Sequence, residues 1–105
     1  MYFKVGAAPS GDYTWRLYGN NHEVAAWAGE PFPSPSRATR ACEAFKVGAY
    51  TARFEIYEGT GAKWRWRAWE SNEKVAASGT AFPSKADAER AAENVKRNAD
   101  EATGP

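Results

Sequence analysis

Hydrophobic and polar residues alternate in several short stretches of the chain, and turn-forming residues separate these stretches. "YFKV" leads through "PSGD" to "YTWRLY", and "RFEIYE" leads through "GTGA" to "WRWRAWE". Alternation with a period of two predicts strands, and Gly, Pro, Ser and Asp between them predict turns. With the shorter stretches "EVAAW" and "KVAAS", the pattern predicts two sets of three strands.

Each set of strands is followed by a segment with helical spacing. Small or apolar residues recur every three or four positions, at Ala38, Ala41, Cys42 and Phe45 and again at Ala88, Ala91, Ala92, Val95 and Ala99. This spacing predicts two amphipathic helices with a narrow face that can lie close to a sheet. Ser34 and Ser84 are placed as N-caps, and Gly48 as a stop. The last four residues, "ATGP", are expected to fray.

The order of elements occurs twice. Residues 13–29 align with residues 64–80 at an offset of 51, and after one extra residue in the first copy, residues 32–46 align with 82–96 at an offset of 50. We interpret residues 1–105 as a single domain of two repeats, 1–51 and 52–105. Because about 50 residues are marginal alone, the repeats should share one core. The predicted fold is α+β, a tandem β-β-β-α repeat with pseudo-two-fold symmetry, in which two helices pack on one face of an antiparallel sheet.

Composition narrows the class of protein. Fourteen Lys and Arg against thirteen Asp and Glu give a formal net charge of +1, whereas a dedicated nucleic-acid binder usually has a clear basic excess. The single cysteine, Cys42, cannot form an internal disulfide, which fits a reducing compartment. The chain has no apolar run of about 20 residues and no signal-peptide pattern. We therefore expect a cytoplasmic protein that does not enter membranes.

Several motifs resemble those of the YegP-like family of small bacterial proteins, a domain of unknown function. The second copy carries the F-x-I-Y, W-R-W-R, S-K-A and V-K-x-N-A segments of this family. The first copy departs from them, with Gly6 in place of the strand tyrosine, Tyr13 in place of the first tryptophan and a proline-rich "PFPSPS". The resemblance implies β-β-β-α repeats, found singly in homodimers or doubly in one chain. It implies no activity and no catalytic residues.

The tryptophan-rich strand shows how the two faces of the sheet should differ. Alternation puts Trp64 and Trp66 on one face and Arg65, Arg67 and Trp69 on the other. A three-residue turn at Gly59–Gly61 would pair Ile56 with Trp64, Glu55 with Arg65 and Phe54 with Trp66. This register keeps the apolar residues on one side, so Trp64 and Trp66 are expected in the core.

The other face is the candidate binding face, and the helices are expected to leave it uncovered. Its members are Arg16, Tyr18, Tyr57, Arg65, Arg67 and Trp69. One interpretation is a solvated face on which Glu55 pairs with Arg65. The other is a contact surface, because Trp, Tyr and Arg are enriched in binding hot spots and also hold single-stranded nucleic acid by stacking and phosphate contact.

No constellation in the sequence points to an enzyme, a metal or a cofactor. His22 is the only histidine and lies in a predicted turn, and Cys42 lies on a helix face, so neither a metal site nor a Cys–His pair is expected. Three functions remain open. They are a non-catalytic module that binds a protein through the candidate face, a single-stranded nucleic-acid binder that uses the same face, and a small-molecule pocket between the repeats. The intact chain is expected to be a monomer.

Overall fold

The computed structural model describes all 105 residues and contains one six-stranded antiparallel sheet with two helices. The chain order is β1 (Tyr2–Ala7), β2 (Tyr13–Tyr18), β3 (Val24–Trp27), α1 (Pro35–Gly48), β4 (Arg53–Glu58), β5 (Trp64–Glu70), β6 (Glu73–Ser78) and α2 (Lys85–Asn98). Short 3-10 turns, η1 (Ala49–Thr51), η2 (Thr60–Ala62) and η3 (Ala99–Glu101), follow α1, β4 and α2. The predicted α+β fold with an antiparallel sheet is confirmed.

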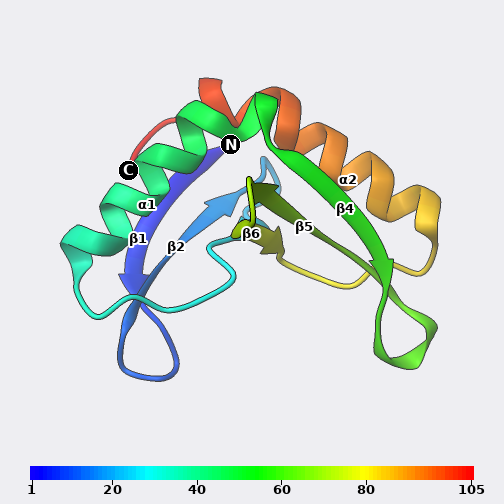
Figure 1. Cartoon of the computed structure of the whole chain (residues 1–105), viewed down its shortest axis with the longest axis horizontal. Coiled ribbons are helices and arrows are strands. Elements are labelled where there is room, and N and C mark those ends of the chain that lie inside the picture. Colours follow the sequence, from blue (N-terminus) through cyan, green and yellow to red (C-terminus); the bar gives the residue numbers. More distant parts are fainter.

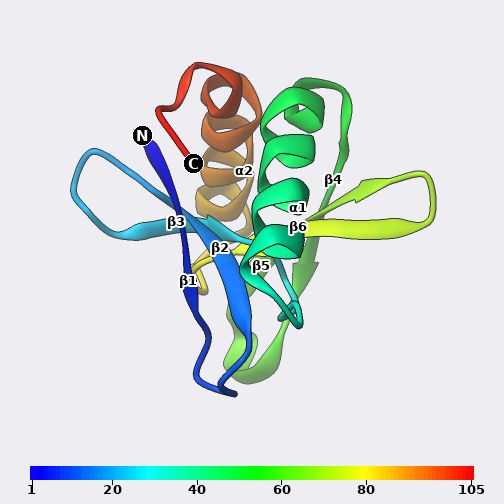
Figure 2. The ribbon, with the colours of Figure 1, turned by 90° about the vertical axis from the view of Figure 1, so that its left-hand side faces the viewer.

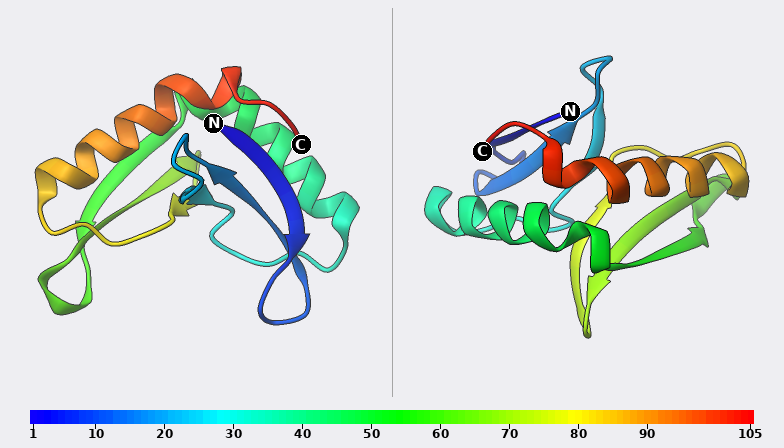
Figure 3. Two further views of the ribbon diagram at one scale, coloured as in Figure 1. Left: turned by 180° about the vertical axis from the view of Figure 1, so that it is seen from behind. Right: turned by 90° about the horizontal axis from the view of Figure 1, so that it is seen from above.

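The strand order in the sheet is β1-β2-β3-β6-β5-β4, so β3 and β6 meet at its centre. Only two residue pairs join them, Ala26 with Ser78 and Trp27 with Ala77. Figure 1 shows the two halves as the sides of an inverted V, with α1 and α2 along the outer sides. The helices run inwards, and their C-terminal turns η1 and η3 contact each other at the apex. Figure 2 shows α1 and α2 side by side, with β1 on one side of the pair and β4 on the other, and Figure 3 shows each helix next to the strands of its own half.

Both helices begin as predicted. The Ser34 hydroxyl accepts a hydrogen bond from the backbone N–H of Arg37 at 3.3 Å, and the Ser84 hydroxyl accepts one from Asp87 at 3.1 Å. Each bond satisfies an N–H that has no partner inside the helix. Pro35 stands at the start of α1, where a missing N–H has no cost. The helix ends at Gly48, as the sequence predicted.

The core lies between the helices and one face of the sheet. Trp15 and Trp66 are fully buried there with Phe45 and Val95, and the remaining core is mostly alanine. Small side chains let the helices lie close to the sheet, so two indoles fill much of the space. The prediction for Trp66 is confirmed. Trp64 is only half-buried, because it lies at the end of the sheet and pairs with Glu58.

The predicted register of the β4–β5 hairpin is wrong by two residues. Ile56 pairs with Trp66, Glu55 with Arg67 and Phe54 with Ala68. The last pair of the hairpin is Glu58 with Trp64, so residues 59–63 form the connection in place of the expected three-residue turn. The backbone N–H of Gly59 donates to the Lys63 carbonyl at 2.7 Å and closes this loop around η2. Since side chains alternate with a period of two, a two-residue shift leaves every side chain on its predicted face.

The extra residue of the first half lies earlier in the chain than the sequence alignment predicted. Ala26 and Ala28 have the same burial as Ala76 and Ser78, so β3 and β6 correspond at an offset of 50, not 51. The extra residue therefore lies in the turn that joins β2 to β3. A turn absorbs one residue without cost to pairing, whereas a one-residue slip in a strand would exchange its faces.

The C-terminal tail does not fray as expected. Thr103 forms a parallel bridge with Tyr2, and the Phe3 N–H donates to the Thr103 carbonyl at 2.8 Å. The Lys46 ammonium donates to the Gly104 carbonyl at 2.7 Å. The tail is held because it satisfies backbone groups on the outer edge of β1 that no other strand pairs.

Candidate functional site: the open face of the sheet

The face of the sheet that turns away from α1 and α2 is here called the open face. The pairings place one residue of each strand in a row across it: Lys4, Arg16, Trp27, Ala77, Arg67 and Glu55. Tyr18, Tyr57, Arg65 and Trp69 flank this row, so all six predicted binding-face residues lie on the open face. None of the six is buried, which leaves them accessible to a partner.

In the second half, Arg67 is the centre of a preorganised cluster. Its Nε donates to Glu55 Oε1 at 2.6 Å, and the same oxygen accepts from Trp69 Nε1 at 3.1 Å. The guanidinium lies 4.4 Å from the centre of the Tyr57 ring and 5.5 Å from that of Trp69. The predicted pairing of Glu55 with Arg65 is wrong, because the register brings Arg67 opposite Glu55.

This cluster sets the charge states of its members. The hydrogen bonds from Arg67 and from the Trp69 indole hold the pKa of the Glu55 carboxyl below its usual value. The bond to Glu55 raises the pKa of Arg67 in turn. Both groups are therefore charged at neutral pH, and the pair holds the aromatic side chains around it in fixed positions.

The first half of the open face is organised differently. Tyr2 stacks on Tyr18 with ring centres 5.0 Å apart, and the Tyr2 hydroxyl lies 3.1 Å from His22 Nδ1. Neither Lys4 nor Arg16 forms a salt bridge. The only hydrogen bond of the Arg16 side chain is a long one, 3.5 Å, to the Ala7 carbonyl. These two cations are therefore available to an anionic group.

Sequence reasoning did not include Trp27 or Lys4 among the candidate residues of the open face. Trp27 lies at the centre of the row, between Arg16 and Ala77, and Lys4 lies at its β1 end. Alternation from the buried Ala26 could have identified Trp27. Thr14 lies on the same side of β2 as Arg16 but is buried, and its hydroxyl donates to the Glu30 carbonyl at 3.2 Å.

The other candidate residues do not form a second site. His22 lies in the β2–β3 turn with a φ of 64° and contacts Tyr2. Cys42 is buried in the core, as expected for a small residue of the helix stripe. No group of three His, Cys, Asp or Glu side chains is close enough to hold a metal ion. No helix has both the length and the apolar character that crossing a membrane requires.

Because Cys42 is buried, its thiol should make the free energy of unfolding depend on pH. Desolvation raises the pKa of its thiol to about 12, from an ordinary value of 9.0. Below pH 9 the Cys42 thiol is neutral in both the folded and the unfolded protein. Above pH 9 the thiol ionises in the unfolded protein before it does so in the folded protein, and this ionisation stabilises the unfolded state. We expect the free energy of unfolding to fall between pH 9 and 12, and to fall less steeply in Cys42→Ala. Urea melts of the wild type and Cys42→Ala between pH 9 and 12 measure this difference. If the free energy of unfolding falls equally with pH in both proteins, Cys42 is not the group responsible.

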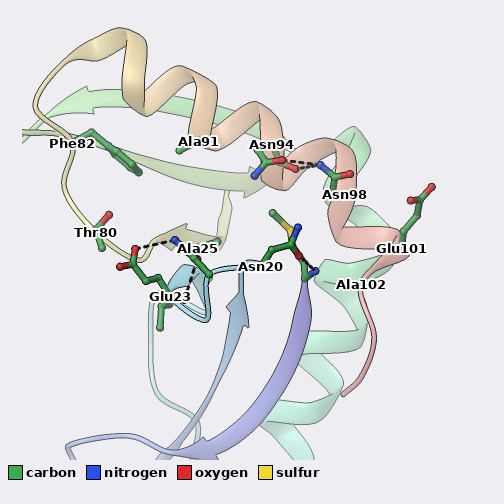
Figure 4. A pocket seen from close by; sticks show the side chains of 14 residues that line it. Asn20, Glu23, Ala25, Thr80, Phe82, Ala91, Asn94, Asn98, Glu101 and Ala102 are labelled. Atoms are coloured by element: carbon green, nitrogen blue, oxygen red, sulfur yellow. Dashed lines mark hydrogen bonds between the residues drawn. The ribbon is translucent and has the colours of Figure 1, made fainter.

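A groove of about 660 Å³ lies between the two halves. The turn after β2 forms one wall, and α2 with the segment before it forms the other (Figure 4). On the α2 wall, the Asn98 side chain donates to Asn94 Oδ1 at 2.8 Å. On the opposite wall, Asn20 Oδ1 accepts a hydrogen bond from the N-terminal ammonium at 3.1 Å. In the other half, the Glu70 carboxylate lies against Gly48. Gly19, which corresponds to Glu70 at an offset of 51, is one of the residues that line the groove.

Comparisons with known proteins agree with this fold. Residues 60–103 match the family model described as a domain of unknown function, DUF1508. The solution structure of the protein of unknown function yegP from E. coli is similar, with a TM-score of 0.79 and 16% identity, over 97% of this chain and 88% of that one. A UPF0339 protein from Shewanella oneidensis gives a TM-score of 0.80 and 17% identity, over 97% and 86%.

At these identities the two solved structures establish the fold and no function. No curated protein matches the chain significantly. The matched segment covers the W-R-W-R strand and α2, which carry most of the motifs quoted above. The matched segment and the shared fold together support the YegP-like family that those motifs predicted, a family of unknown function.

Proposed function

We propose that the chain is a non-catalytic interaction module, located in the cytoplasm, that binds a protein partner through the open face. The observation that carries this proposal is the cluster around Arg67. One carboxylate fixes an arginine and a tryptophan, and the arginine lies over two aromatic rings. Side chains ordered before binding lose little conformational entropy on binding, which favours affinity.

The composition of the face supports a protein as partner. Trp27, Tyr57, Arg67 and Trp69 belong to the residue types that supply most hot spots in protein interfaces. All four are partly accessible, and a six-stranded surface offers enough area around them for a rim. An enzyme is not proposed, because the open face brings together no nucleophile, base and oxyanion donors.

Single-stranded nucleic acid is the second candidate, and the charge of the open face favours it. Stacking of bases on aromatic rings requires free ring faces. Arg67 already lies over Tyr57, and Tyr2 and Tyr18 stack on each other, so few faces are free. A small-molecule ligand in the groove between the halves ranks third. The groove has a suitable volume but is open and lined by amides and carboxylates, whereas ligand pockets are usually mostly apolar.

Affinity capture from a host lysate, with and without nuclease, tests the proposal. We expect the wild-type chain to retain one or more proteins in both conditions, and the triple variant Arg65→Ala/Arg67→Ala/Trp69→Ala to lose them. A matched control, Arg37→Ala/Arg40→Ala, removes exposed cations from α1 and should capture as wild type does. Retention of the same proteins by the triple variant would contradict the proposal.

Binding of single strands should be weak or absent at physiological salt. A short single-stranded oligonucleotide, titrated at low and physiological salt, measures this. A micromolar complex that weakens steeply with salt, and that Trp69→Ala abolishes, would favour nucleic acid over protein.

A further inference from the structure

We infer that the partner presents an acidic, extended segment, and that this segment binds across Lys4, Arg16 and Trp27 in the first half of the open face. The inference rests on the proposed function and adds the chemistry of the partner and the part of the face that receives it. Three observations carry it: the separation of charge between the two sides of the sheet, the lack of an acidic partner for two cations, and the position of Trp27.

Charge is strongly segregated in this chain, although its net charge is only +1. The strand pairings place one carboxylate, Glu55, on the open face. They also place six cations there, namely Lys4, Arg16, Arg53, Arg65, Arg67 and Lys74. Eight basic and twelve acidic residues remain for the rest of the chain. The open face is therefore basic on a protein whose other surfaces are acidic, and such a field attracts and orients an anionic partner.

Lys4 and Arg16 are two cations of the open face whose charge no carboxylate of the chain neutralises. Glu55 already neutralises Arg67, at 2.6 Å. Lys4 and Arg16 lie opposite each other on β1 and β2 and form no salt bridge. The Lys4 ammonium lies 5.7 Å from the centre of the Tyr2 ring, and the Arg16 guanidinium donates to the Ala7 carbonyl at 3.5 Å, so neither cation faces an acidic group. A carboxylate of the partner placed between them would neutralise this charge and accept hydrogen bonds from both side chains.

Trp27 supplies an apolar contact next to these cations. Trp27 is on β3, pairs with Arg16 of β2 and Ala77 of β6, and lies on the face of the sheet opposite the buried Ala26. Unlike Tyr57, it has no cation over its ring. A half-buried tryptophan with free surface, beside unpaired charge, is typical of a binding hot spot.

The spacing of these residues suits an extended peptide. Neighbouring strands lie about 5 Å apart, so Lys4 and Trp27 are separated by about 10 Å across the sheet. Alternate side chains of an extended chain lie about 7 Å apart on one side. A carboxylate and an apolar side chain two positions apart can thus reach the two cations and the indole together. Nucleic acid fits less well, because Trp27 offers one stacking surface where a strand of bases would use several.

The experiment is an NMR titration of the full ¹⁵N-labelled chain with three probes of equal length. They are a synthetic peptide with glutamate and leucine at alternate positions, the same peptide with glutamine in place of glutamate, and a single-stranded oligonucleotide. We expect the acidic peptide to shift the Trp27 indole signal and the amides of Lys4 and Arg16. The glutamine peptide should leave them unchanged, and the oligonucleotide should bind more weakly than the acidic peptide.

Variants locate the contact. Lys4→Ala/Arg16→Ala should weaken binding of the acidic peptide about tenfold, since it removes two charge pairs. Arg37→Ala/Arg40→Ala removes the same charge from α1 and should change the affinity less than twofold. Equal losses in the two variants, shifts confined to the second half, or tighter binding of the oligonucleotide would each overturn the inference. If the acidic peptide fails to bind while lysate capture still depends on the open face, the inference is wrong and the proposed function stands.

Discussion

Replacing Trp66 with alanine is expected to lower the free energy of unfolding by about 3–5 kcal/mol. The indole is fully buried among small core residues, which cannot move in to fill the space it leaves. Trp15→Ala should cost about as much, because Trp15 stacks on Phe45 with ring centres 5.0 Å apart. A small domain has only about 5–15 kcal/mol of stability, so either change removes a large share of it. Urea melts followed by far-UV circular dichroism measure the loss.

Two further variants show whether the loss comes from the cavity. The indole N–H of Trp66 is buried without an acceptor, and phenylalanine removes this unsatisfied donor while it keeps most of the volume. Trp66→Phe should therefore cost under about 2 kcal/mol. Arg67→Ala, on the other face, should cost about 1 kcal/mol or less, as an exposed ion pair does. Similar losses in Trp66→Ala and Arg67→Ala would contradict the assignment of the core.

Residues 52–105, expressed alone, are expected to form a folded homodimer. In the intact chain, β6 pairs with β3 and α2 contacts β3 and η1. The isolated half loses these contacts and exposes an apolar edge that a second copy can cover.

The register at the centre of the sheet allows such a dimer. Ala26 corresponds in burial to Ala76, and Trp27 to Ala77. The observed pairs Ala26–Ser78 and Trp27–Ala77 would become Ala76–Ser78 and Ala77–Ala77 between two copies. These pairs are symmetric about Ala77, as a two-fold axis requires. Replacement of Trp27 by Ala77 at this contact leaves no bulky side chain on the open face to clash.

Light scattering on the half and on the intact chain tests this prediction. We expect twice the mass of residues 52–105 for the half and the mass of one chain, 11.5 kDa, for the whole. A half that is folded and monomeric would show that the two halves are independent units, and the proposal of a shared core would fail.

The sequence predicted the elements and faces well because both depend on local patterns. Periods of two and of three to four residues identified six strands and two helices, and serine caps located the starts of α1 and α2. The register of β4 and β5 was wrong because it depends on the conformation of residues 59–63, where Gly61 and Ala62 have positive φ. An alanine at positive φ is uncommon, and no residue pattern in "GTGA" indicates it.

The candidate site was predicted in part for a similar reason. Strand alternation placed Arg16, Arg65, Arg67 and Trp69 on one face, as the pairings show. Which arginine meets Glu55 depends on the register, so that contact could not be predicted. The row from Lys4 to Glu55 depends on the pairing of β3 with β6, a contact between segments about 50 residues apart that no local pattern reveals.

The central claim is that the helix-covered face of the sheet carries stability and the open face is free for binding. The free energy of unfolding of Arg65→Ala/Arg67→Ala/Trp69→Ala, measured beside that of Trp66→Ala, tests it most directly. If the claim is correct, the triple variant stays folded, with a loss of about 2 kcal/mol or less from one exposed ion pair and partly accessible side chains. A loss as large as that of Trp66→Ala would contradict it, because the open face would then be part of what holds the fold together.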